Sequence, residues 1–439
     1  MPDSTILTAA ELIELVTEAR ARTLELTADL SDEQIIGPRL DIVNPPLWEI
    51  GHVAWFQEKW VLRHHAGARP LREDADRLYD SAAVPHGIRW DLPLPRRQQT
   101  LAYMQQALEA VVEHVQSQDA SAELTYFCLL AVFHEDMHAE AITYTRQTHG
   151  YPAPWLDIAP VRPRETQREA TSRGDVEIPG GTYLLGAPPS SAFVFDNEKW
   201  SHAVDVPPFA IGRAQVTNAE FSGFIEEGGY GRPELWSDEG WAWREGARAE
   251  CPLYWRRDTG RGWLRRHFDR LVALEPDHPV IHVNWYEADA YCRWAHRRLP
   301  TEPEWELAAS AEPTSDGRHI TARKRRFPWG EEPPSASRAN LDWRALGCVP
   351  VAALPDGDSA FGCRQMIGNV WEWTSTAFGP YPGFVPDPYE QYSEPSFGSH
   401  RVLRGGGWAT RGRLLRNTWR NFYPPHRRDV WAGFRTCTA

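Results

Sequence analysis

The spacing of apolar residues changes near residue 150, and this change constrains the fold more than any other feature. Before it, apolar residues recur at helical intervals; beyond about residue 176, short strand-like runs alternate with Gly, Pro, Asn and Trp. A single core rarely grows beyond about 250–300 residues, and this chain has 439. We therefore expect an α+β protein with a helical domain over 1–152, a linker over 153–175 and a domain poor in regular structure over 176–439.

Local signals place the helices. Thr8 and Glu11 have the spacing of a capping box, which starts a helix. Three further helices are expected in the first domain, after Asn44-Pro45-Pro46, over about 99–117 and over about 121–147. Four such helices favour an antiparallel four-helix bundle. In the second domain we expect two short helices, over 217–227 with Thr217 as cap and over 285–297.

Composition narrows the range of partners. The net charge is -13, and the one basic run, Arg323-Lys324-Arg325-Arg326, is expected to be a solvated loop, so we expect no nucleic-acid partner. No apolar stretch approaches the roughly 18 residues of a membrane span, and the first residues lack signal-peptide features. The six cysteines form no CxxC pair, which favours reduced thiols and a cytoplasmic protein. The oligomeric state is not indicated.

Two histidines have the spacing of a metal-binding pair. His134 and His138 stand at i and i+4 in the string His134-Glu135-Asp136-Met137-His138, so on a helix both imidazoles lie on one face. HExxH is also the signature of zinc proteases, in which the glutamate is the general base. The pair alone therefore leaves open metal binding, zinc hydrolysis with Glu135 as base, and a solvated helix face.

His52 supplies a third candidate ligand. It stands in an apolar stretch of the second expected helix, where a lone histidine is more often a core residue. Across a helical bundle, however, it would complete a three-histidine face. His65 or His86 could take its place, whereas His64, His114 and His149 are less well placed. Three neutral imidazoles leave open coordination positions, which suits Fe(II) that reacts with dioxygen or Zn(II) that activates water.

A set of motifs spans nearly the whole chain. They are Gly51-His52, the His134/His138 pair, Ile178-Pro179-Gly180-Gly181, Phe195-Asp196-Asn197-Glu198, Val216-Thr217-Asn218-Ala219-Glu220-Phe221, Arg298-Leu299-Pro300-Thr301-Glu302-Pro303-Glu304-Trp305, Gly368-Asn369-Val370-Trp371-Glu372-Trp373, Arg404-Gly405-Gly406-Gly407-Trp408 and Gly433-Phe434-Arg435. With them the chain resembles the ergothioneine-type sulfoxide synthases. These join a DinB-like helical bundle to a formylglycine-generating-enzyme (sulfatase-modifying-factor) domain of C-type-lectin-like fold.

The resemblance implies an iron- and dioxygen-dependent oxidoreductase that joins sulfur or selenium to hercynine, the trimethylated betaine of histidine. It makes His52, His134 and His138 the ligands of Fe(II). Formylglycine-generating enzymes use a cysteine pair just after the Arg-Gly-Gly motif. The corresponding stretch here, 408–413, contains no cysteine, so that activity is not expected.

The resemblance also assigns residues of the second domain. A loop of this domain contributes a catalytic tyrosine in the family, and the matching stretch 388–393 makes Tyr389 the candidate proton donor, with Tyr392 beside it and Tyr381 as competitor. Asn421 would contact the carboxylate or imidazole of hercynine. Phe422 would pack against its trimethylammonium group, as aromatic faces do with quaternary cations.

Three departures from the family bear on the second substrate, and by this resemblance Tyr423, Met137 and Arg89 are further candidate substrate-binding residues. Ergothioneine synthases that use γ-glutamylcysteine commonly have Asp where this chain has Tyr423, Gln where it has Met137, and an Arg-rich loop where 78–91 has only Arg89. Fewer charged groups suit a neutral, polyhydroxylated donor, so among these enzymes we favour a selenoneine synthase that uses a selenosugar. An ergothioneine-type synthase that uses γ-glutamylcysteine or cysteine is the alternative, and a non-catalytic lectin-like binding module is a third.

Overall fold

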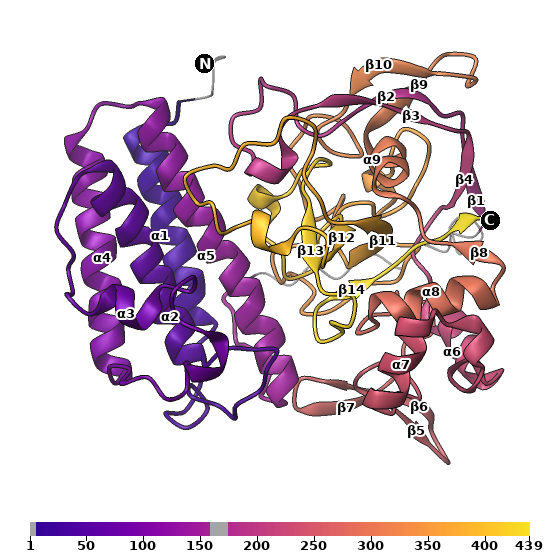
Figure 1. The fold of residues 1–439 in the computed structure, drawn as a ribbon, viewed down its shortest axis with the longest axis horizontal. Coiled ribbons are helices and arrows are strands. Elements are labelled where there is room, and N and C mark those ends of the chain that lie inside the picture. The colour runs from indigo at the N-terminus through magenta and orange to yellow at the C-terminus, as the bar shows by residue number, and fades with distance from the viewer. Residues whose placement is uncertain (1–5, 159–173) are drawn as a thin grey trace. The chain divides into compact units, whose positions relative to one another are not determined.

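A computed structural model describes residues 6–158 and 174–439, which form two compact units (Figure 1). The N-terminal unit comprises Met1–Asp157 with Ser190–Phe193 and Phe268–Arg270, and the C-terminal unit comprises the rest. Most of the expected linker, 153–175, lies outside the described residues, and the exact domain limits stay predictions. Within the described ranges, no helix combines the length and apolarity needed to cross a membrane.

The expected long helices of the N-terminal unit are confirmed. They are α1 (Ala9–Glu25), α2 (Pro46–Gln57), α4 (Arg97–Ser117) and α5 (Ala122–His149). The Thr8–Glu11 capping box forms at the start of α1, and Ser121 caps α5. Helices α1 and α2 each pack against both α4 and α5.

Helix α2 is the most buried element of this unit. All of its residues are buried, which agrees with an apolar stretch that has no polar face. It continues as the π-helix η1 (Glu58–His65), and the short helices α3 (Ala75–Tyr79) and η2 (His86–Ile88) follow. Helix α3 packs against α2, so backbone groups of α3 come close to side chains of α2.

The C-terminal unit consists of small sheets, short helices and long connections. Its strands form sheets of order β1-β4-β15-β8, β13-β12-β11-β14, β5-β6-β7, β2-β3 and β10-β9. The strands are β1 (Asp175–Ile178), β2 (Gly181–Leu185), β3 (His202–Val206), β4 (Phe209–Gly212), β5 (Trp255–Asp258), β6 (Gly262–His267), β7 (Arg270–Ala273), β8 (Arg297–Arg298), β9 (Ala311–Pro313), β10 (Ile320–Lys324), β11 (Trp371–Ala377), β12 (Arg401–Arg404), β13 (Asn421–Tyr423), β14 (Ala432–Gly433) and β15 (Cys437–Thr438).

Helices of this unit begin at clear capping signals. The two expected helices are confirmed as α6 and α8, and two further helices, α7 and α9, were not expected. The α-helices are α6 (Asn218–Glu226), α7 (Asp238–Ala247), α8 (Trp285–Trp294) and α9 (Glu302–Ser310). Single 3-10 turns are η4 (Asp196–Glu198), η5 (Gly229–Gly231), η6 (Pro233–Leu235), η7 (Pro355–Gly357), η8 (Glu394–Ser396) and η9 (Gly412–Leu414). Helix α9 was missed, although Thr301 and Glu304 form a capping box at its start, as Thr217 and Glu220 do in α6.

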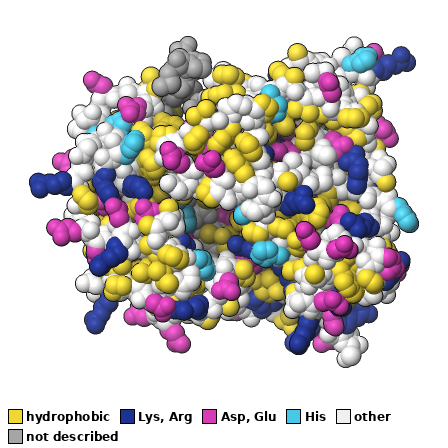
Figure 2. All heavy atoms as spheres, viewed as in Figure 1, with side chains coloured by type: hydrophobic (Ala, Val, Ile, Leu, Met, Phe, Trp, Pro, Cys, Tyr) yellow, Lys and Arg dark blue, Asp and Glu magenta, His cyan; other side chains and the backbone are white. Residues whose placement is uncertain are grey.

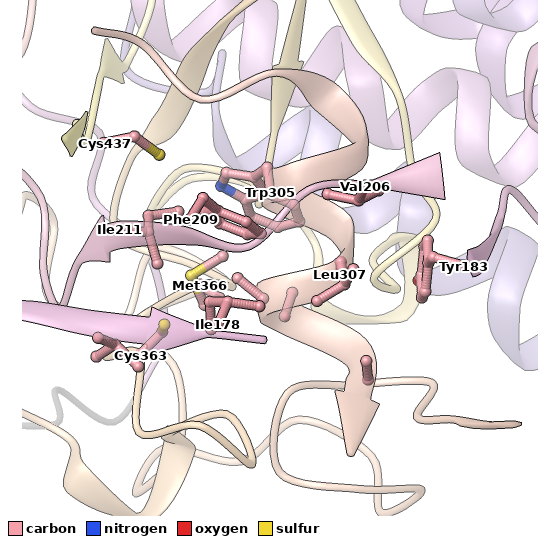
Figure 3. Packing of buried hydrophobic residues seen from close by; sticks show 14 of the residues in the cluster. Ile178, Tyr183, Val206, Phe209, Ile211, Trp305, Leu307, Cys363, Met366 and Cys437 are labelled. Carbon is pink, nitrogen blue, oxygen red and sulfur yellow. The ribbon is translucent and has the colours of Figure 1, made fainter. Parts of the chain in front are cut away.

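One apolar cluster holds α9 against the sheet that contains β1 and β4. Trp305 and Leu307 of α9 pack with Ile178 of β1 and Ile211 of β4, all at most 1% exposed (Figure 3). The β1–β4 register pairs Ile178 with Phe209 and Val176 with Ile211, so alternate residues of both strands face α9. Full burial of each such side chain contributes roughly 1.5–3 kcal/mol.

The basic run at 323–326 is not a solvated loop, which corrects the sequence interpretation. Lys324 ends β10, and its ammonium group donates to the buried carboxylate of Glu306 over 2.5 Å. Arg325 pairs with Glu312 over 2.7 Å. Both cations therefore belong to structural ion pairs. Elsewhere, basic and acidic side chains alternate over the face shown in Figure 2.

All six cysteines are free thiols. Burial raises the pKa of Cys128, Cys348 and Cys437 to about 12 and that of Cys251 to about 11. Burial also raises the pKa of the other two, Cys292 and Cys363. The thiols are therefore protonated at neutral pH, as expected for buried cysteines without a redox role.

Candidate metal centre

Three histidines of the N-terminal unit converge. Helix α2 provides His52, and α5 provides His134 and His138, one turn apart. One ring nitrogen from each lies within 4.8 Å of the others, and the ring centroids are 4.4–5.0 Å apart. Three imidazoles in such an arrangement are a donor set for a divalent transition metal.

The orientation of His52 is set by its neighbours. Its Nδ1 lies 2.7 Å from the carbonyl oxygen of Tyr79, and because a carbonyl only accepts, Nδ1 carries the proton. The lone pair is then on Nε2, where a metal can use it. Gly51 allows this contact, because a Cβ there would lie 2.3 Å from the Tyr79 ring. The indole of Trp48 stacks on the imidazole of His52, with ring centroids 4.5 Å apart.

His138 is held by Glu49, a residue that the sequence analysis missed. The Nδ1 of His138 forms a short hydrogen bond with the Glu49 carboxylate, which in turn accepts from Asn44 Nδ2 over 2.5 Å. A carboxylate behind a metal-binding histidine fixes its tautomer and raises its basicity. The signal in the sequence is the i, i+3 spacing of Glu49 and His52 on one helix, which is too common to recognise alone.

Burial keeps the ring nitrogens available as ligands. Burial, followed by the neighbouring His138, lowers the pKa of His52 from 6.5 to about 3, and burial lowers the pKa of His134 well below its usual value. Burial alone would raise the pKa of Glu49, but His138 and Asn44 hold it at about 2. At neutral pH the site thus contains the neutral imidazoles of His52 and His134 and the carboxylate of Glu49, a combination that suits a divalent cation.

Glu135 of the HExxH string faces away from this cluster. Its carboxylate forms a two-point ion pair with Arg20, at 2.8 and 3.2 Å, and both side chains are about 2% exposed. Arg20 also donates to Gln57 and to the carbonyl of Met104. A carboxylate with both oxygens engaged in this way is poorly placed as a general base, so the geometry disfavours the zinc-hydrolase alternative.

The histidines considered as substitutes have other partners. His65 and His114 contact each other, with Nδ1 and Nε2 3.1 Å apart. His86 Nε2 bonds the carbonyl oxygen of Val43 over 2.8 Å. Neither His65 nor His86 joins the cluster of His52, His134 and His138.

Two proposed substrate residues also belong to this unit. Met137 precedes His138 on α5 and is partly buried. Arg89 is 8% exposed; its guanidinium donates to Asn44 Oδ1 over 2.7 Å and to the Val84 carbonyl over 3.2 Å. Arg89 is therefore anchored inside the unit.

The candidate residues of the C-terminal unit form one aromatic cluster. Tyr389 and Tyr392 have ring centroids 5.8 Å apart, and Tyr392 meets the ring of Phe422 edge-on at 5.7 Å. Phe422 stacks on Phe378 at 4.0 Å. Burial, with Asp196 nearby, raises the pKa of Tyr392 well above 10. The rings of Tyr389, Tyr392 and Phe422 thus lie close together within this unit.

Asn421 and Tyr423 flank Phe422 on β13, the end strand of its sheet. The Oδ1 of Asn421 accepts the backbone N–H of Phe422 over 2.8 Å, and the Arg427 guanidinium lies over the Tyr423 ring at 5.2 Å. Tyr381, the competing tyrosine, is only 6% exposed and belongs to the apolar core, beneath Arg420. Its burial in that core favours Tyr389 over Tyr381 as the functional tyrosine.

Known proteins resemble the chain over its whole length. Residues 15–142 match the DinB superfamily, and residues 161–439 match the sulfatase-modifying factor enzyme 1-like domain. A hercynine oxygenase of Mycolicibacterium thermoresistibile is 38% identical, over 97% of this chain and 94% of its own length. The chain belongs to the hercynine oxygenase family. A hercynine oxygenase of Mycolicibacterium smegmatis is also 38% identical, over 95% of this chain and 96% of its own length.

Membership of the hercynine oxygenase family makes the chain an oxidoreductase of the oxygenase type, with an N-terminal DinB domain and a C-terminal sulfatase-modifying-factor domain. The second domain alone is also similar to a formylglycine-generating enzyme of Streptomyces coelicolor, 32% identical over 57% of this chain and 83% of that protein. The match to hercynine oxygenases extends over both domains, and it includes the helices that bring His52, His134 and His138 together.

Proposed function

We propose that this chain uses Fe(II) and dioxygen to join a chalcogen atom to the imidazole of hercynine. The single observation that carries the proposal is the cluster of His52, His134 and His138 in a chain 38% identical to hercynine oxygenases. The three imidazoles, with Glu49 hydrogen-bonded to His138, fit a divalent iron ion and leave positions open for other ligands. When bound, the iron supplies the electron transfer that dioxygen chemistry requires.

The chain's own residues bind and orient the substrates. Phe422 packs its ring face against the trimethylammonium group of hercynine, and Asn421 donates a hydrogen bond to the carboxylate or imidazole. Tyr389 delivers a proton from its phenolic hydroxyl, with Tyr392 beside it. The grouping of Tyr389, Tyr392 and Phe422 in one aromatic cluster supports these roles.

For the chalcogen donor we propose a neutral selenosugar, so that the product belongs to selenoneine biosynthesis. Three positions support this choice. Tyr423 and Met137 replace a carboxylate and an amide found in synthases that use γ-glutamylcysteine, and Arg89 is engaged with Asn44 and Val84. A donor rich in hydroxyl groups is recognised by hydrogen bonds and ring faces and needs no opposite charge.

The alternative donor is a thiol, γ-glutamylcysteine or cysteine, as in ergothioneine-type sulfoxide synthases. The names of the relatives favour hercynine as substrate and leave the donor open. A donor competition separates the two: iron-loaded protein, hercynine and dioxygen with a selenosugar, γ-glutamylcysteine or cysteine, read by mass spectrometry. We expect a product only, or mainly, with the selenosugar. Turnover with only the peptide thiol would contradict this donor.

Metal analysis and dioxygen uptake separate the other classes of function. A zinc hydrolase would take up no dioxygen when hercynine is added, and a non-catalytic binding module with a lectin-like domain would bind ligand without turnover. We expect one iron per chain after anaerobic loading and hercynine-dependent dioxygen uptake.

The proposal also includes an antiparallel four-helix bundle for the first domain, a C-type-lectin-like fold for the second domain and a cytoplasmic location.

A further inference from the structure

A chain of hydrogen bonds leads from Arg89 to the candidate ligand His138. The guanidinium Nη1 of Arg89 donates to Asn44 Oδ1 over 2.7 Å. Asn44 Nδ2 donates to Glu49 Oε1 over 2.5 Å, and the other oxygen of Glu49 contacts His138 Nδ1. Glu49 is 2% and Arg89 8% exposed. The two charged groups of the hydrogen-bond chain are therefore largely shielded from water, while Asn44 and His138 are partly buried, and charge-assisted hydrogen bonds contribute more in such surroundings than at the surface.

Arg89 also reaches the second candidate ligand through stacked rings. Its guanidinium carbon lies 3.9 Å from the centroid of the Trp48 ring. Trp48 also stacks on His52; the two ring centroids are 4.5 Å apart and the ring planes are inclined by 13°. A planar guanidinium stacks on an aromatic face far better than a lysine ammonium does. One cation thus supports His138 through Asn44 and Glu49, and His52 through Trp48.

We propose that Arg89, Asn44 and Glu49 are positioning residues. They orient the candidate metal ligands and keep the proton of the His138 ring on Nδ1. Arginine can only donate, so it obliges the Asn44 side chain to present its oxygen to Arg89 and its NH2 group to Glu49. The Glu49 oxygen that faces His138 accepts a hydrogen bond from Nδ1. The lone pair of His138 Nε2 is then available to the metal.

This assignment differs from the role that the sequence suggests for Arg89, a contact with the donor substrate. A guanidinium that stacks on Trp48 and donates to Asn44 and Val84 already has its planar face and two of its nitrogens occupied. Its charge also balances the buried carboxylate of Glu49, which would otherwise be costly. The inference rests on the proposed function only in that His52, His134 and His138 bind a metal.

The test measures metal affinity, which needs neither hercynine nor dioxygen. Co(II) is titrated anaerobically into wild-type protein and three variants, Glu49→Gln, Asn44→Ala and Arg89→Met, and the visible absorption of bound Co(II) is recorded. Loss of a residue that orients a ligand typically weakens metal binding about 10–100-fold. We expect that loss for Glu49→Gln, and about tenfold for Asn44→Ala and Arg89→Met, each with a changed Co(II) spectrum.

Arg39→Met is the matched control. Arg39 also lies over a tryptophan, Trp90, at 5.9 Å and pairs with Asp91, but it is half-exposed and outside the hydrogen-bond chain. Its Co(II) affinity and spectrum should equal those of the wild type. Should Arg89→Met not fold, as judged by circular dichroism, Arg89→Lys replaces it. Lysine keeps a donor for Asn44 but loses the planar contact, so we expect a smaller loss of affinity.

The outcomes separate this inference from the proposed function. Wild-type affinity and spectrum in Asn44→Ala and Arg89→Met would overturn the inference alone. In particular, an Arg89→Met protein with normal Co(II) binding and a raised KM for whichever chalcogen donor the wild type uses would assign Arg89 to donor binding. A wild type that binds neither Co(II) nor Fe(II) would overturn the proposed function and the positioning role together.

Discussion

Glu135 and Arg20 form a buried ion pair in which both carboxylate oxygens are engaged, at 2.8 and 3.2 Å. Removing one partner of such a pair leaves an uncompensated charge, which costs about 3–5 kcal/mol. We expect Arg20→Met to lower the free energy of unfolding by that amount, measured by urea unfolding. The double variant Arg20→Met/Glu135→Leu should recover most of the loss. Equal stabilities of the single and double variants would contradict a structural pair.

Glu135 also offers a direct test of the HExxH interpretation. We expect Glu135→Gln to bind metal with the stoichiometry of the wild type, because its carboxylate is directed to Arg20. Elemental analysis after anaerobic iron loading gives the stoichiometry. Glu135→Gln protein that loses its metal would assign the carboxylate to the metal site instead.

His138→Ala should abolish stoichiometric iron binding. The substitution removes one of only three candidate ligands in the cluster and leaves Glu49 without its imidazole partner. Iron content is measured after anaerobic loading and gel filtration. His65→Ala is the control, since His65 pairs with His114 outside the cluster, and it should retain iron. Stoichiometric iron in His138→Ala would mean that the ligands are wrongly assigned.

Substitution of the tyrosine hydroxyls should separate Tyr389 from its neighbours. We expect Tyr389→Phe to reduce product formation at least tenfold, about the range of general acid catalysis, and to leave iron content unchanged. Tyr381→Phe, altered in the apolar core, should affect product formation little. The ratio of product to dioxygen consumed is the decisive measurement. A larger loss in Tyr392→Phe would move the proton donor to Tyr392.

The loop that carries both tyrosines is fixed at its two ends. Lys199 donates to Asp387 over 2.5 and 2.7 Å, while Ser393 bonds Asp196 and accepts from Asn197 Nδ2 over 3.0 Å. We expect Ser393→Ala to increase the rate of limited proteolysis at 387–393, because one anchor is lost. An unchanged cleavage rate would show that Lys199 and Asp387 hold the loop without Ser393.

The C-terminal unit should lose stability in acid through Glu306. Burial alone would raise the pKa of this carboxyl, but Lys324 and Arg404 lower it from 4.5 to about 2. A depressed pKa stabilises the fold fully above about pH 4.5, and the effect is lost as the pH falls towards 2. Urea midpoints measured across this range should therefore decrease with falling pH. Glu306→Gln should start lower at neutral pH and change less.

Those parts of the fold that depend on local signals could be predicted from the sequence. The capping boxes at Thr8 and Thr217 and the helical spacing of 121–147 correspond to α1, α6 and α5. Helix α9 was not predicted, although it has the length and the kind of capping box of α6; its packing depends on a sheet whose strands are far away in sequence. The ion pairs of Lys324 and Arg325 were not predicted, because their partners Glu306 and Glu312 belong to other elements of the structure.

In the candidate site, too, local features could be predicted from the sequence and long-range contacts could not. The i, i+4 spacing of His134 and His138 is local, so it predicts two neighbouring imidazoles without knowledge of the fold. Glu49 contacts His138 across 89 residues of sequence, and no pattern in the sequence predicts that contact. The direction of Glu135 also depends on a distant partner, Arg20. The packing of the helices determines which polar side chains contact the candidate metal ligands and which form structural ion pairs.

The buried, protonated cysteines have a consequence for the durability of the protein. A thiol attacks disulfides, selenenyl groups and peroxides as its thiolate, and pKa values of about 11–12 leave very little thiolate at neutral pH. The cysteines of this chain should therefore react slowly with disulfides, selenenyl compounds and peroxides. We expect intact mass spectra of the protein to show no added mass after many turnovers.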